Sequence, residues 1–255
     1  ILNRPNLPNI NSLAEPELKL AGARINPNTH GQSRDYYMDN ISFRAIGDDK
    51  LLKIKGLPTK RCFKNIIWSP DGTKVAFTNT TAKGISLWVT FTDTQKAERL
   101  TEPIINQTFG GNPVRWLPNS EGIVYKSVTK VQGNKPKSDL VPKGPVIHDN
   151  NGQQAMARTY QDLLKNAHDE ALFTYYFTSQ LCCTDLAGNT RNIGKAAIIK
   201  GFSVSPNGAY ILVQYTHKPF SYLVPHQRFP LTVEVWDLQG KLIKVMANTP
   251  LLEHI

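Results

Sequence analysis

The stretch Ile67–Phe77, with the sequence IWSPDGTKVAF, predicts an apolar strand, a tight turn and a second apolar strand. The turn chemistry is specific, because proline fixes φ at about −65°, aspartate hydrogen-bonds its own backbone and glycine tolerates a positive φ. The pattern recurs. Trp116–Tyr125 (WLPNSEGIVY) is a looser copy and Val204–Val213 (VSPNGAYILV) is a close one. Three copies of one hairpin indicate a repeat protein.

Each copy is followed by a second hairpin, whose polar turn contains an aspartate: Asp93, Asp185 or Asp237. The second repeat carries about 44 more residues than the first, and the third about 8 more, around an underlying period of about 48. Four strands in each repeat at such a period are typical of β-propeller blades. The predicted fold class is therefore all-β: a partial β-propeller of four-stranded antiparallel blades with one helical insertion.

The repeats also predict how one propeller domain over residues 1–255 is divided. We expect a half blade at about 41–61, blades at about 62–101, 105–195 and 197–247, and a helical insertion at about 138–177.

Local patterns add four details to this division. Apolar residues recur at helical spacing over Ala157–Phe177, with a break near residues 166–169 and Asp169 as a candidate N-cap. Residues 14–20 are a candidate helical turn, and residues 22–34 are expected to form a long polar loop. Strands are expected to resume at Ile41, so residues 1–40 are expected to be otherwise irregular.

Composition narrows the class of protein. A chain of 255 residues with 40% hydrophobic residues can bury one sizeable core. No run of 18 apolar residues occurs, so no membrane span is predicted. The net charge is +10, but the basic residues are scattered, which favours a solvated surface over a nucleic-acid site.

Cysteine and histidine spacing gives no metal or cofactor site. Cys62 stands alone, whereas Cys182 and Cys183 are adjacent in an apolar strand and are expected to be buried on opposite faces. No Cys-x-x-Cys and no histidine pair at metal-ligand spacing occurs. We therefore expect neither a metal, nor a cofactor, nor a disulfide framework.

The residues do not predict a catalytic centre. A serine nucleophile on a strand-to-helix turn requires Gly-x-Ser-x-Gly, and the nearest match, Gly201–Ser205, lacks the last glycine and lies in a predicted strand. The paired carboxylates Asp48-Asp49 and Asp169-Glu170 are more typical of turns and helix starts than of acid–base pairs. No catalytic residue is assigned.

Longer motifs resemble a known family. They are ARINP at 23–27 with QSR at 32–34, LVPKGP at 140–145, TYQDLL at 159–164, and HKPFSY at 217–222 followed by VP at 224–225 and RFP at 228–230. In this order they resemble the propeller domain of prolyl oligopeptidase-family serine peptidases. The glutamyl endopeptidase branch, known from chloroplasts and with bacterial relatives, is the most similar.

The resemblance implies a two-domain enzyme, in which an α/β-hydrolase domain with a Ser-Asp-His triad follows the propeller and the propeller restricts access to it. No residue here maps onto that triad, and a chain that begins at Ile1 is expected to be a fragment or a processed form. The implied partners are peptide substrates and the C-terminal hydrolase domain of the same protein. Bacterial periplasm, cytoplasm and plastid all remain open as locations.

Two other functions compete with this one. A stand-alone propeller would act as a protein- or peptide-binding platform without any hydrolase. A basic module for nucleic acid is disfavoured, because no motif for it occurs. Strands left unpaired at the edges of a partial propeller also predict either self-association into an oligomer or completion by further blades.

Four basic residues are candidate substrate-binding groups. The resembling branch cleaves after glutamate, and a guanidinium can bind such a carboxylate through two parallel hydrogen bonds. Arg24 and Arg34 lie in the first of the family-like loops, and Lys218 and Arg228 lie in the last. Arg228, in a proline-stiffened loop, is the first choice. The alternative is a surface arginine paired with a nearby carboxylate.

Overall fold

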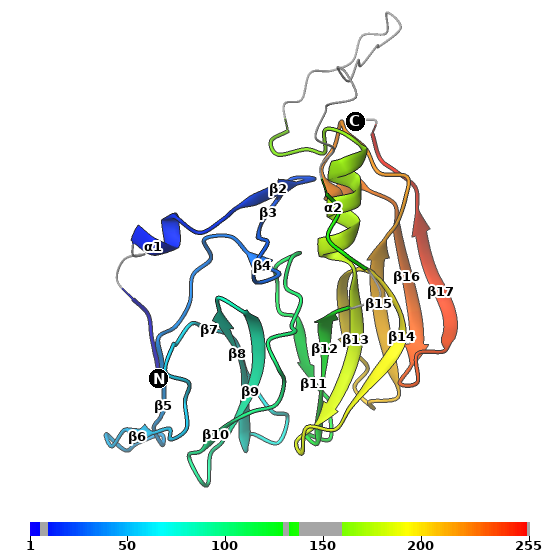
Figure 1. The fold of residues 1–255 in the computed structure, drawn as a ribbon. Coiled ribbons are helices and arrows are strands. Elements are labelled where there is room, and N and C mark those ends of the chain that lie inside the picture. Colours follow the sequence, from blue (N-terminus) through cyan, green and yellow to red (C-terminus); the bar gives the residue numbers. More distant parts are fainter. Residues whose placement is uncertain (6–9, 130–132, 138–159, 254–255) are drawn as a thin grey trace, which may run out of the picture.

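In the computed structural model, antiparallel sheets stand side by side, and the longer of the two helices lies at one end of the largest sheet (Figure 1). The structure describes residues 1–5, 10–129, 133–137 and 160–253. The all-β partial propeller predicted from the hairpin repeats is confirmed, with its single long helix near the C-terminal end of the insertion.

The first two sheets are small. One joins β1 (Leu2–Asn3), β5 (Asn40–Phe43) and β6 (Leu52–Lys53), and the other joins β2 (Leu18–Leu20), β3 (Ala23–Asn26) and β4 (Gly31–Gln32). A complete blade follows, in the order β10-β9-β8-β7. Its strands are β7 (Phe63–Trp68), β8 (Lys74–Thr81), β9 (Gly84–Phe91) and β10 (Ala97–Arg99).

The remaining strands form one seven-stranded sheet. They are β11 (Val114–Trp116), β12 (Gly122–Val128), β13 (Ser179–Asp185), β14 (Thr190–Val204), β15 (Tyr210–Thr216), β16 (Leu231–Asp237) and β17 (Leu242–Thr249). The first half of β14 pairs with β13 and the second half pairs with β15. Two four-stranded blades thus share β14. The exact blade limits at 62–101, 105–195 and 197–247 stay predictions.

The repeated turns have the geometry that their sequence predicts. Ser69 Oγ lies 2.5 Å from Asp71 Oδ1 and accepts the Lys74 N–H at 2.9 Å, and Gly72 has a φ of 69°. The third copy repeats this arrangement through Ser205 and Asn207. Local side-chain chemistry therefore determines where these hairpins reverse.

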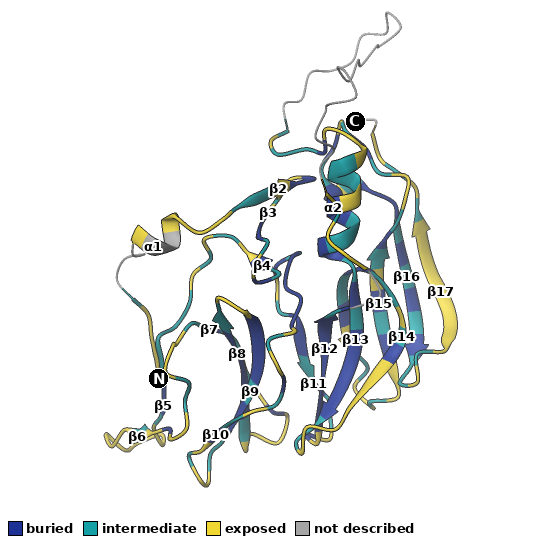
Figure 2. Ribbon diagram, in the orientation of Figure 1, coloured by how far each residue is buried: buried dark blue, intermediate teal, exposed yellow. Residues whose placement is uncertain are grey.

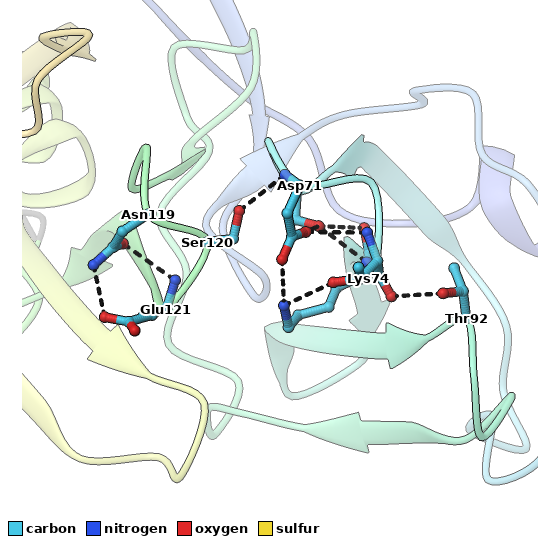
Figure 3. Close-up of polar contacts among 8 residues, drawn as sticks. Asp71, Lys74, Thr92, Asn119, Ser120 and Glu121 are labelled. Atoms are coloured by element: carbon cyan, nitrogen blue, oxygen red, sulfur yellow. Dashed lines mark hydrogen bonds and ion pairs between the residues drawn. The ribbon is translucent and has the colours of Figure 1, made fainter.

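Neighbouring turns also touch one another. The Asp71 N–H donates to Ser120 Oγ at 3.0 Å, which joins the first turn to the second (Figure 3). A Cβ placed on Gly208 would lie 3.4 Å from Pro118 Cδ, so the third turn packs on the second. The three hairpin turns consequently form a row along one end of the blades.

The core is divided into layers between adjacent sheets. Alternate residues of β12 face opposite layers: Ile123 and Tyr125 pack toward β8 and β9, whereas Val124 packs with Ile211 and Val213 of β15. These central strands are largely buried, while β17, at the end of the sheet, is exposed along most of its length (Figure 2).

Three local predictions need correction. Residues 14–17 are not helical; instead α1 spans Ile10–Leu13 and residues 18–20 form β2. The predicted polar loop at 22–34 contains β3 and β4, because the polar residues of this segment pair through their backbones. The region before Ile41 is therefore partly strand rather than irregular.

The predicted helix is shorter than its apolar spacing suggested. α2 spans Ala167–Phe177, because Asp162 has a φ of 59° and the backbone at 160–166 is extended or bent. Asn166, rather than Asp169, is the N-cap: its side chain accepts the Asp169 N–H at 2.9 Å. Asp169 in turn accepts the Lys165 N–H. Residues 138–159 of the predicted insertion lie outside the described residues.

Candidate functional site

Three segments that are distant in sequence meet at the end of the blades opposite the row of turns. They are the β2–β3 turn, residues 160–164 and the β15–β16 loop. The Gly22 N–H donates to the Asp162 carbonyl at 2.8 Å, and the His226 N–H donates to the Ala21 carbonyl at 2.8 Å. Gly22 is required there, because its φ is 80° and a Cβ would lie 2.7 Å from Pro225 Cβ.

An aromatic cluster supports these segments from below. Phe173 and Phe177 of α2 stack at 4.4 Å between ring centres, and Phe173 also contacts the rings of Phe220 and Phe229 at 5.2 and 5.7 Å. Leu20 and Ile25, near the N-terminus, belong to the same buried cluster, which includes Val224. α2 therefore joins the β2–β3 hairpin to the β15–β16 loop.

The meeting point contains an open cavity of about 790 Å³. Arg24 and Arg228 both line it, so two of the four predicted binding residues lie at one site. The other lining residues are Gly22, Tyr160, Gln161, Asp162, Pro225 and Gln227.

Arg24 is already paired. Its Nε donates to Asp162 Oδ2 at 2.6 Å, and Lys19 Nζ lies 3.6 Å from the other carboxylate oxygen. The hydrogen bond from Arg24 lowers the pKa of Asp162 and raises that of Arg24. This role of Asp162 was not predicted, because the apolar spacing around it indicated a helix. Arg24 consequently orders the cavity wall.

Arg228 carries the unpaired charge of this cavity. It is half-buried in the short 3-10 helix η2 (His226–Arg228), and its guanidinium forms no ion pair with any described residue. Its backbone is fixed, since its N–H donates to the Pro225 carbonyl and its carbonyl accepts the Leu252 N–H. The guanidinium of Arg228 could therefore donate hydrogen bonds to a carboxylate placed in the cavity.

The other two predicted residues lie elsewhere. Arg34 Nε is 3.9 Å from Glu17 Oε2 and lines a separate cavity of about 430 Å³. Lys218 Nζ is 3.0 Å from Glu170 Oε2 and 5.7 Å from the centre of the Phe220 ring. The ammonium group of Lys218 is therefore already paired with a carboxylate.

His226 lies behind the cavity and predicts a pH dependence of stability. It is 7% exposed and packs on Phe109 at 5.1 Å between ring centres. Burial, together with the charge of Lys200, lowers its pKa to about 4.

Between pH 6.5 and about 4, His226 is therefore protonated in the unfolded chain but neutral in the folded chain. Stability should fall across this window as pH falls, by about 3 kcal/mol from His226. Urea titrations from pH 7.5 to 4 should show a smaller pH slope for His226→Gln than for the parent chain. Equal slopes would contradict the prediction; His30, whose pKa burial also lowers, should keep its part of the slope in both chains.

Other chemistry is sparse in the described part of the chain. No group of three or more His, Cys, Asp or Glu side chains there is placed to hold a metal ion. No helix there is long and apolar enough to cross a membrane. Cys182 and Cys183 are both buried in β13, and Ser203 lies within β14, as their sequence context predicted.

Comparison with known proteins identifies the relatives. The whole chain aligns at 34% identity with a protein named probable glutamyl endopeptidase, chloroplastic, from Oryza sativa subsp. japonica. The chain is homologous to a segment of the glutamyl endopeptidases. It is also 33% identical over its full length to the protein of the same name from Arabidopsis thaliana. In each case it spans 28% of the length of the glutamyl endopeptidase.

No family model matches the chain. Among solved structures, it resembles the β-propeller domain of the trilobed protease from Pyrococcus furiosus, with a TM-score of 0.41 and 10% identity, over 74% of this chain and 43% of that one. It also resembles the acylaminoacyl peptidase of Pyrococcus horikoshii, with a TM-score of 0.44 and 14% identity, over 84% of this chain and 28% of that one.

Proposed function

We propose that this chain is a non-catalytic propeller segment of a serine peptidase and controls which peptides reach a hydrolase domain in the same protein. The observation that carries the proposal is that the whole of this chain is homologous to a segment of proteins named probable glutamyl endopeptidase. The cavity supports it, because a cleft lined by an unpaired guanidinium suits a peptide that bears a carboxylate.

A test of the parent protein comes first. The coding sequence after residue 255 should contain Gly-x-Ser-x-Gly on a predicted strand-to-helix turn, followed by an aspartate and a histidine. If these are absent, the peptidase proposal fails and the stand-alone binding platform takes its place. A probe that labels active serines should then leave the whole protein unmodified.

We propose that Arg228 binds the glutamate side chain of the substrate. In the peptidase that carries this chain, Arg228→Ala should lower kcat/KM by ten- to a hundredfold for peptides with glutamate before the cleaved bond. That loss corresponds to about 1.4–2.8 kcal/mol. Its upper part overlaps the range of about 2–5 kcal/mol for removing one partner of a buried charge pair, as expected for a half-buried arginine. Matched peptides with glutamine at the same position should lose little.

Lys218→Ala is the matched control, because Lys218 lies in the same loop but already pairs with Glu170. Lys218→Ala should change kcat/KM neither for the glutamate peptides nor for the glutamine peptides. An equal loss for glutamate and glutamine peptides with Arg228→Ala would mean that Arg228 shapes the loop. No loss would assign substrate reading to another group.

A further inference from the structure

A second cavity, of about 240 Å³, lies between β11, β12 and the second half of β14. Three cations line it: Arg115 from β11, Lys126 from β12 and Lys200 from β14. No described carboxylate forms an ion pair with any of the three. This cavity is not the one lined by Arg24 and Arg228.

Lys126 is the most unusual of the three cations. It is 2% exposed and, in the alternation of β12, points to the same side as the core residue Val124. Its ammonium group donates one long hydrogen bond, to the Ile199 carbonyl at 3.4 Å, and lies 5.8 Å from the centre of the Phe109 ring. An ammonium group has three donors, and a buried charge is costly without a charged partner.

The other two cations contact neutral groups. Arg115 Nη1 donates to the carbonyls of Asn112 and Val114, and its guanidinium lies 5.9 Å from the centre of the Phe202 ring. Lys200 Nζ donates to the His226 carbonyl at 3.2 Å. The hydrogen bonds that these three cations donate all go to backbone carbonyl oxygens, so no negative charge compensates theirs.

We propose that this cavity binds a carboxylate group of a peptide, with Lys126 at its base and Arg115 and Lys200 at its sides. A planar guanidinium suits a carboxylate, and the apolar wall formed by Phe202 and Leu212 suits the methylene groups next to it. The carboxylate has two sources, an acidic side chain or a free C-terminus. That a peptide supplies it rests on the proposed function, whereas anion binding itself does not.

Binding can be measured on this 255-residue chain by calorimetry. The probes are acetyl-Ala-Glu-amide, which carries only a side-chain carboxylate; acetyl-Ala-Ala, which carries only a terminal one; and inorganic phosphate. Acetyl-Ala-Gln-amide is the neutral control and should not bind. Binding by one of the two carboxylate peptides identifies the source. Binding by phosphate alone, or by no probe at millimolar concentration, would overturn the proposal.

The number of protons taken up on binding distinguishes this cavity from a site on the protein surface. Burial, with a contribution from Arg115, lowers the pKa of Lys126 to about 8, and burial also lowers the pKa of Lys200. The neighbouring His226 stays neutral at alkaline pH. At pH 8.5, binding of an anion should therefore raise the pKa of these lysines again. The protein should then take up roughly one proton for each anion bound. Heats measured in buffers of different ionisation enthalpy give this number directly, and binding without proton uptake would indicate a surface site.

Variants complete the test. Lys126→Met should weaken binding of the carboxylate peptide at least tenfold and abolish most of the proton uptake. Lys83→Met, at an exposed turn between β8 and β9, is the matched control and should change neither. If Lys126→Met fails to fold, the half-buried Arg115→Met should still weaken binding tenfold. Unchanged affinity in the folded cavity variants would overturn the proposal, whether or not the parent protein proves to be a peptidase.

Discussion

Replacing Phe173 by alanine should lower the free energy of unfolding by about 3–5 kcal/mol, the range for a fully buried phenylalanine. Phe173 is 0% exposed and contacts the rings of Phe109, Phe177, Phe220 and Phe229. Its removal leaves a cavity at the junction of three segments, so little collapse can fill it. Urea denaturation at pH 7.5 measures the loss.

Phe173→Leu is the matched control. It keeps most of the apolar volume and loses only the ring geometry, so it should cost about 1 kcal/mol. A loss below 1 kcal/mol with alanine would mean that α2 is held by other contacts. Equal losses for both variants would place the stabilisation in the ring contacts rather than in the filled volume.

Replacing Gly240 by alanine should cost about 4 kcal/mol, for two reasons that add. Its φ of 84° strains any residue with a Cβ, and that Cβ would overlap the backbone nitrogen of Gly194 on β14. The position of the Cβ is fixed by the backbone of residue 240 and the atom that it meets is backbone, so a side-chain rotation cannot relieve the overlap. The measurement is again urea denaturation.

The chain contains a close control for this prediction. Gly188 lies in the equivalent turn of the preceding blade, where Asp185, like Asp237, accepts the N–H groups two and four residues later. Gly188 has a φ of 89° but open space around it. Gly188→Ala should therefore cost only about 1 kcal/mol, from strain alone. Similar losses of stability for Gly240→Ala and Gly188→Ala would contradict the prediction, because they would show that β14 shifts to accommodate the added Cβ.

The fold was predictable where its determinants are local. Ser69, Asp71 and Gly72 define a turn among themselves, and the alternation of apolar residues on either side defines two strands. The same chemistry defines the turn at Ser205–Gly208. The blades could therefore be recognised from short stretches that need no distant partner.

The sites were less predictable, because they depend on distant contacts. Arg24 meets Asp162, 138 residues away, and this pairing accompanies a positive φ at Asp162 that apolar spacing does not reveal. Asn166 took the capping position because its side chain reaches the Asp169 N–H. The burial of Lys126 could have been suspected, since it occupies an apolar face between Val124 and Val128.

The aromatic cluster around α2 bears on how the whole molecule loses its structure. The layered cores join each sheet only to its neighbours, and such arrays tend to melt in stages from one end. The cluster instead connects Leu20 with Phe229, across most of the chain, so the β2–β3 hairpin cannot separate from the β15–β16 loop without breaking it. Denaturation of the intact chain should consequently be cooperative, with fluorescence and circular dichroism giving superimposable transitions.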